Sequence, residues 1–77
     1  PGFDGPGDAW LNLGNVYRDQ MRHREAEEAF RAALAAPGFD TPGKAWNNLG
    51  IVYHDQNRYR EAEEAFRAAL AAPGFDT

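Results

Sequence analysis

The sequence predicts an all-α fold, an α-solenoid of two helix-turn-helix units, and two observations support this prediction. One 36-residue unit is written twice, because residues 1–36 and 37–72 agree at 29 of 36 positions, and residues 73–77 begin a third copy. Within each unit, apolar residues recur at the spacing of one helical face. A fixed period of this length is typical of solenoids, in which each unit buries its apolar face mainly against its neighbours. We therefore expect a single domain over residues 1–77.

The first helix of each unit is expected to begin at a proline step, Gly5-Pro6 in one copy and Thr41-Pro42 in the other. Proline suits the first helical turn because its missing N–H needs no partner there, and Thr41 is a better N-cap residue than Gly5. An apolar face follows at relative positions 0, +3, +4 and +7 in both copies: Trp10, Leu13, Gly14 and Tyr17, then Trp46, Leu49, Gly50 and Tyr53. A glycine inside a helix costs about 1 kcal/mol, so its presence in both copies indicates that a neighbouring helix approaches closely.

A turn is expected near residues 21–23 and 57–59, where each first helix ends. Asn57 suits the left-handed conformation that ends a helix, whereas Met21 suits it poorly. A second helix is then predicted over about residues 24–36 and 60–72. Its core face is formed by the same five residues in each copy: Ala26, Ala29, Phe30, Ala33 and Leu34, then Ala62, Ala65, Phe66, Ala69 and Leu70.

The outer side of the second helix is rich in charge between Arg24 and Arg31. We interpret this stretch as a solvated face rather than a binding patch, because its charges stand at the spacing of intrahelical ion pairs. The Pro37-Gly38 step should end the helix, and Phe39 is expected to fold back onto its last turn.

The charge balance disfavours two classes of partner. A net charge of -4 and an isoelectric point near 4.9 oppose binding to nucleic acids or to anionic membrane surfaces. The sequence shows no apolar run long enough for a membrane span and no signal peptide. The absence of cysteine leaves no disulfide framework and no thiolate metal site. From these observations we expect a cytoplasmic location and neither nucleic acid nor membrane as a partner.

No combination of residues predicts catalysis, a cofactor or a bound metal. His23 and His54 are the two histidines, and the chain contains no serine. His54 and Asp55 are sequence neighbours, so on a helix they point about 100° apart and form no dyad. The Glu25-x-Glu27-Glu28 run lacks a histidine at metal-ligand spacing. We therefore expect a protein that is not an enzyme.

The pattern Trp10-x2-Leu13-Gly14-x2-Tyr17, followed by Ala26-x3-Phe30, resembles the tetratricopeptide repeat, and the second copy reproduces it. The resemblance implies four antiparallel helices in right-handed superhelical stacking, and a scaffold for protein-protein interaction. The period of 36 exceeds the usual 34 of the family. The two additional residues fall in the connector at residues 37–43, which is similar to kinesin-light-chain-type repeats.

The resemblance also implies a concave groove, lined by the first helices, that binds a peptide or a helix of a partner protein. Four of the seven differences between the copies are spaced 3, 4 and 3 residues apart and so lie on one helical stripe, which corresponds to that groove. The candidate groove residues are Asp8, Leu11, Asn15, Arg18, Lys44, Asn47, Asn48, Ile51 and His54. Drift at exposed positions is the alternative explanation of these differences.

A known ligand of the family is the C-terminal carboxylate of heat-shock chaperones. Asn15 and Asn48 correspond to two asparagines of that carboxylate clamp, but Leu11 replaces a clamp lysine. Chaperone-tail binding is therefore not expected. Leu11 and Ile51 would suit a helix or a hydrophobic peptide better.

Two units are fewer than the three or so that repeat proteins usually need, which favours self-association. Apolar residues at the two ends of the stack, Trp10 and Tyr17 at one and Phe66 and Leu70 at the other, would be complementary. The expected partner is a protein or a peptide, including a second copy bound by end-to-end stacking or by exchange of a helix pair. Two alternatives remain open: a monomeric module that binds a peptide in the concave groove, and a chain designed to test repeat folding, without a biological ligand. Whether the chain is engineered or excised from a longer array is also left open.

Overall fold

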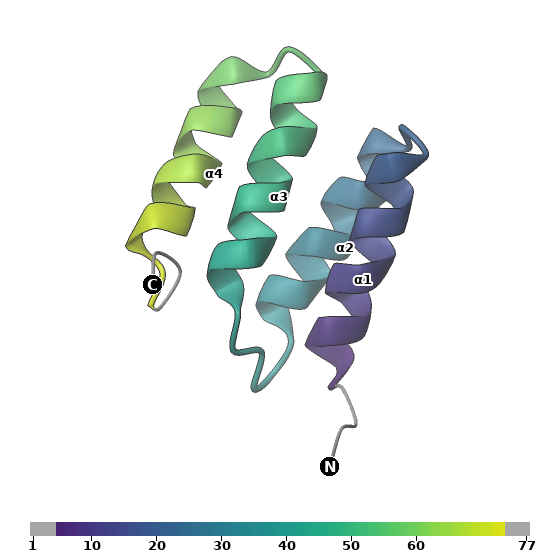
Figure 1. Ribbon diagram of the computed structural model, residues 1–77, viewed down its shortest axis with the longest axis vertical. Coiled ribbons are helices and arrows are strands. Elements are labelled where there is room, and N and C mark those ends of the chain that lie inside the picture. The colour runs from purple at the N-terminus through teal and green to yellow at the C-terminus, as the bar shows by residue number, and fades with distance from the viewer. Residues whose placement is uncertain (1–4, 74–77) are drawn as a thin grey trace.

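The computed structural model describes residues 5–73, which form four α-helices. These are α1 (Pro6–Asp19), α2 (His23–Ala35), α3 (Pro42–Asp55) and α4 (Tyr59–Ala71). Helices α1 and α2 form one hairpin and α3 and α4 another, and α2 packs against α3 to join them (Figure 1). The predicted all-α fold of two helical hairpins is confirmed. The predicted third unit lies largely outside the described residues.

Both first helices begin at a proline, as predicted, but their caps do not differ in the expected way. Gly5 and Thr41 occupy the N-cap positions, and neither makes a side-chain capping bond. The carbonyl of Thr41 accepts a hydrogen bond from the N–H of Lys44 at 3.1 Å, whereas its hydroxyl does not act as a cap. The expected advantage of Thr41 over Gly5 as a capping side chain is therefore wrong.

The second helices begin and end one residue earlier than predicted. Ala36 is extended, with φ -73° and ψ 134°, because a residue that precedes proline is pushed out of the helical region. Ala72 has the same conformation before Pro73. The proline, and not the last alanine, therefore sets the end of each second helix.

The turn inside each hairpin has one residue in the left-handed region. The φ angle is 63° at Asn57, as predicted, and 61° at Met21. In both turns the following arginine N–H donates to the carbonyl of the tyrosine in the first helix at 2.9 Å. The hairpin geometry therefore imposes this conformation on Met21, at a cost of about 1 kcal/mol for a residue that disfavours it.

Two glycines allow the close packing that the sequence predicted. A Cβ atom placed on Gly14 would lie 2.5 Å from the ring of Phe30, and one on Gly50 would lie 2.6 Å from the ring of Phe66. Phe39 also contacts the first hairpin from the side of α1. Its ring packs against Gly7 of α1, where an added Cβ would lie 2.6 Å away, and it contacts the edge of the core.

The core is concentrated where the two hairpins meet. Its largest fully buried side chains are Phe30 of α2 and Leu49 and Val52 of α3. The described helices include none that is long and apolar enough to cross a membrane. The junction of α2 with α3 thus provides much of the packing that holds the chain together.

Candidate functional site

The candidate groove residues lie on α1 and α3, but one of them is unavailable to a ligand. Leu11 is only 8 % exposed and belongs to the hydrophobic core, which corrects its assignment to the groove. The physical reason is that α1 contacts α3 as well as α2, so the stripe is covered at this position. Most other members are half-buried, and Lys44 and His54 are exposed.

Three of these polar residues form a hydrogen-bonded set that we call the groove-side cluster: Asn15, Arg18 and Asn48. Arg18 Nη1 donates to Asn48 Oδ1 at 2.9 Å, and Asn48 Nδ2 donates to Asn15 Oδ1 at 3.0 Å. The two asparagines that correspond to a carboxylate clamp are therefore bonded to each other. They join the first hairpin to the second.

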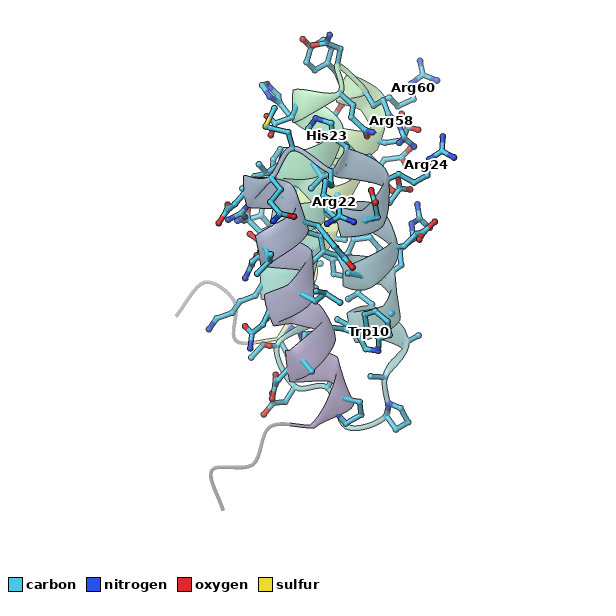
Figure 2. The ribbon with its side chains drawn as sticks, turned by 90° about the vertical axis from the view of Figure 1, so that its right-hand side faces the viewer. Trp10, Arg22, His23, Arg24, Arg58 and Arg60 are labelled. Atoms are coloured by element: carbon cyan, nitrogen blue, oxygen red, sulfur yellow. The ribbon has the colours of Figure 1, made fainter. Side chains whose placement is uncertain are left out.

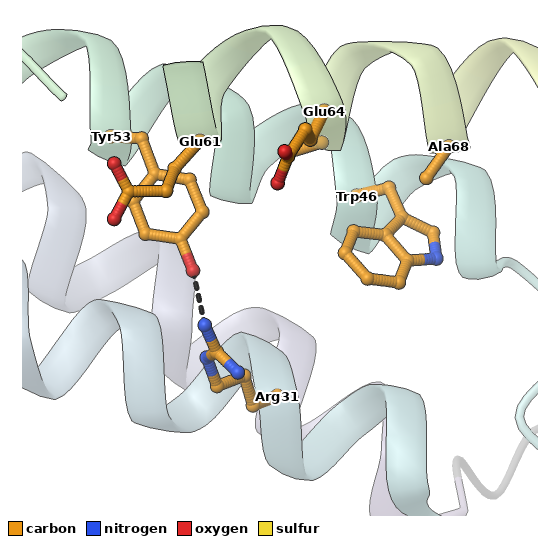
Figure 3. Close-up of a pocket in the computed structure, with 7 residues that line it drawn as sticks. Arg31, Trp46, Tyr53, Glu61, Glu64 and Ala68 are labelled. Carbon is orange, nitrogen blue, oxygen red and sulfur yellow. Dashed lines mark hydrogen bonds between the residues drawn. The ribbon is translucent and has the colours of Figure 1, made fainter. Parts of the chain in front are cut away.

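A second polar set, which we call the outer cluster, joins the same two hairpins: Glu27 and Arg31 of α2 with Tyr53 and Arg58. The Tyr53 hydroxyl donates to Glu27 Oε2 at 3.2 Å and accepts a hydrogen bond from Arg31, as Figure 3 shows for the arginine. Arg58 Nη1 lies 3.1 Å from Glu27 Oε1, and the Arg58 guanidinium stacks 4.5 Å from the centre of the Tyr53 ring.

The outer cluster corrects the interpretation of residues 24–31 as a solvated face at one position, Glu27, whereas Arg24, Glu28 and Arg31 are exposed as expected. The side chain of Glu27 is only 18 % exposed, because it contacts both Tyr53 and Arg58 of the next unit. One signal in the sequence could have indicated this role. Glu27, Arg31, Tyr53 and Arg58 all belong to positions that are identical in the two copies, as expected of positions that pack every unit against the next.

Burial and hydrogen bonding shift several pKa values, most of them at this junction and one, that of Glu25, at the turn of the first hairpin. Burial raises the pKa of the Tyr53 hydroxyl, and the hydrogen bond to Tyr53 raises the pKa of Arg31. The hydrogen bond to Arg58 lowers the pKa of Glu61, and Arg22 lowers that of Glu25 in the same way. The junction thus favours a neutral phenol between charged guanidinium and carboxylate groups.

A cavity of about 260 Å³ opens beside the outer cluster, between α2, α3 and α4 (Figure 3). Its lining residues are Arg31, Trp46, Tyr53, Glu61, Glu64, Ala65 and Ala68. Within residues 5–73, no three histidine, aspartate or glutamate side chains are grouped closely enough to hold a metal ion.

The two ends of the stack expose apolar side chains whose counterparts at the junction are buried or half-buried. On α1, Trp10 and Leu13 are exposed and Val16 is 50 % exposed, whereas its counterpart Val52 is fully buried. Figure 2 looks onto this side of the stack, with Trp10 near one tip of the helices and Arg22 near the other.

On α4, at the opposite end of the stack, Leu70 is 68 % exposed. Tyr17 and Phe66, the other two end residues predicted from the sequence, are half-buried. Val16 was missed.

A family model described as "Tetratricopeptide repeat" matches residues 7–73. The chain belongs to the tetratricopeptide repeat family. No curated protein and no solved structure matches it significantly. Members of this family are scaffolds for protein-protein interaction that bind proteins or peptides and are typically non-enzymatic.

As tetratricopeptide repeats, the two units offer three surfaces on which a protein could bind. These are the stripe on α1 and α3, the exposed end of α1 and the exposed end of α4. The stripe presents mainly polar and half-buried side chains. The two ends present large apolar side chains, and burial of apolar surface is the dominant favourable contribution to most protein association.

Proposed function

We propose that this tetratricopeptide repeat protein is a non-enzymatic scaffold whose copies associate end to end, the α4 face of one copy packing on the α1 face of the next. A single observation carries the proposal. Residues covered at the α2–α3 junction have identical counterparts that are more exposed at the two ends: Val52 is buried and Val16 is exposed on α1, and Leu34 is half-buried whereas Leu70 is exposed on α4. The ends are therefore the two halves of a contact that the chain already makes once.

The expected free-energy gain from burying the apolar side chains of this contact is large. Full burial of one valine or leucine side chain stabilises by about 1.5–3 kcal/mol, and Leu13, Val16 and Leu70 are all exposed at the ends. The contact joins two different faces, so it is heterologous and can continue from copy to copy. We expect an open series of species rather than a closed dimer.

Sedimentation velocity and light scattering across a concentration series test the association. The average mass should rise continuously with concentration and pass that of a dimer. A protein that stays strictly monomeric at millimolar concentration would contradict the proposal.

The polarity of the contact is tested with two blocked variants, Val16→Glu on the α1 face and Leu70→Glu on the α4 face. Each variant alone should be monomeric, because one of the two faces is charged. An equimolar mixture should form a dimer of one chain of each, since each variant retains one intact face. If Val16→Glu alone still dimerises, the contact is a symmetric one or an exchange of helix pairs, and end-to-end stacking is wrong.

Peptide binding along the stripe is a second candidate function. It is favoured by the concentration of sequence differences there, while the outer face of the second helix is identical in both copies. Ile51 is its remaining apolar candidate, because Leu11 is buried. The stripe hypothesis predicts that Ile51→Ser abolishes capture of a helical or hydrophobic peptide at unchanged helicity, and Asp55→Ser provides an exposed control on the same helix outside the candidate groove residues. Capture that survives Ile51→Ser would contradict it.

A further inference from the structure

We infer that the contact between two copies re-forms the outer cluster but not the groove-side cluster, and that Ile51 and His54 are the residues that cause this difference. The inference rests on the proposed end-to-end association and specifies its residues. Within the chain, both clusters join the first hairpin to the second: the outer cluster links α2 to α3 and to Arg58, and the groove-side cluster links α1 to α3. Between chains, each cluster would have to be built from the counterparts of its members, which lie on α4 and at the α1 end for the outer cluster and on α3 and α1 for the groove-side cluster.

The α1 end already holds its half of the outer cluster in the required arrangement. The guanidinium of Arg22 stacks 4.5 Å from the centre of the Tyr17 ring, the same distance that separates Arg58 from Tyr53. Arg22 also bonds to Gln20 at 3.1 Å and to Glu25 at 3.0 Å. Arg58 makes the corresponding bonds at 3.0 Å and 2.9 Å, to Gln56 and Glu61.

The α4 end holds the other half. Glu63 and Arg67 form an ion pair at 2.7 Å, as Glu27 and Arg31 do at 3.1 Å. The side chain of Glu63 is 62 % exposed, because no tyrosine or arginine of a following unit covers it. The four residue types of the outer cluster are therefore present at the two ends, and each half is preorganised for the other. Preorganisation lowers the entropy cost of binding.

The groove-side cluster cannot re-form in this way. The counterpart of Asn48 on α1 is Asn12, which is exposed. The counterparts of Asn15 and Arg18 on α3 are Ile51 and His54. Isoleucine offers no oxygen to accept a hydrogen bond, and the His54 ring packs edge-on against Tyr59 with the ring centres 5.3 Å apart.

The contact between copies is consequently weaker than the contact inside the chain, although their apolar residues are nearly the same. The difference lies in two hydrogen bonds that cross the junction inside the chain and have no equivalent between chains. Two of the seven differences between the copies thus act as specificity determinants. Because these two positions differ between the copies, the contact between chains is weaker than the contact inside the chain and is reversible. An exact repeat of the first unit would give the stronger contact between chains as well.

The double variant Ile51→Asn/His54→Arg tests this assignment, because it restores the groove-side residues at the contact between copies. Its dissociation constant, from sedimentation velocity, should be lower than that of the original chain by about tenfold or more, because two hydrogen bonds between the copies are gained. Circular dichroism should show unchanged helicity. A dissociation constant that is unchanged or higher would overturn the inference.

The outer cluster is tested by Glu63→Gln, with Glu64→Gln as the matched control. Both variants remove one negative charge from neighbouring exposed positions of α4, but only Glu63 corresponds to a member of the outer cluster. Glu63→Gln should weaken association by about tenfold, because the charge-assisted bonds are lost, and Glu64→Gln should leave it unchanged. Equal effects of the two variants would overturn the inference while end-to-end association stands. A strictly monomeric original chain would overturn both.

Discussion

Val52 and Val16 hold the same place in their units, yet Val52 is fully buried on α3 whereas Val16 is half exposed on α1. The same contrast separates Leu49 from Leu13 and Glu27 from Glu63. Because the flanking sequences are nearly identical, the difference comes from the neighbour alone. The α2–α3 junction and the two ends therefore present nearly the same residues, which a neighbouring unit covers at the junction and leaves uncovered at the ends. A substitution at the junction can be compared with the same substitution at the corresponding end position, which serves as its matched control.

A charge placed on each valine in turn should give the largest difference between the covered and the uncovered position. Val52→Asp should unfold the chain or destabilise it by more than about 4 kcal/mol, because it buries an unpaired carboxylate. Val16→Asp should change the free energy of unfolding by no more than about 0.5 kcal/mol, as is usual at exposed positions. Urea denaturation of dilute, monomeric protein provides the measurement. Similar losses for both variants would show that the α1 face is covered in the monomer.

The two helix glycines differ in the same way inside the hairpins, because the phenylalanine that each one contacts is buried to a different extent. Alanine at Gly14 would press on Phe30, which is fully buried at the junction, whereas alanine at Gly50 would press on Phe66, which is half-buried near the uncovered end. Gly14→Ala should destabilise by about 2 kcal/mol, a typical cost of overpacking. Gly50→Ala should cost about 1 kcal/mol less, because the ring of Phe66 has room to move. Thermal unfolding of the two variants measures the difference, and a larger loss for Gly50→Ala would contradict the account.

Tyr53 makes the covered state sensitive to alkaline pH. Burial raises the pKa of its hydroxyl above the ordinary value of 10.0, so the unfolded chain ionises first as the pH increases. The contribution of Tyr53 is fully present below about pH 10 and is lost as the pH rises through its folded pKa. Tyr53→Phe should reduce the stability at pH 7 by about 1–2 kcal/mol and flatten the decline above pH 10. Urea denaturation at several pH values tests both effects, and an unchanged alkaline slope would contradict the role of Tyr53.

Local patterns predicted the helices and their hairpins because those depend on contacts between residues close in sequence. The apolar spacing and the proline steps placed α1 and α3 correctly, and the interior glycines indicated close packing. The contacts between hairpins were not predictable in the same way. Whether Leu11 faces the core or the groove, and whether Glu27 reaches Tyr53, depends on how one hairpin is rotated against the next. No local pattern contains that rotation.

The smallest expected effect concerns the turns, where the two units differ in sequence but not in conformation. Met21 and Asn57 have nearly the same positive φ, yet asparagine tolerates this region and methionine does not. Met21→Asn should therefore stabilise the chain by about 0.5–1 kcal/mol, and Asn57→Met should destabilise it by a similar amount. Chemical denaturation of both variants measures the two changes. Because Met21 is exposed, no lost packing offsets the gain, and a neutral or destabilising Met21→Asn would show that its side chain stabilises the turn in another way.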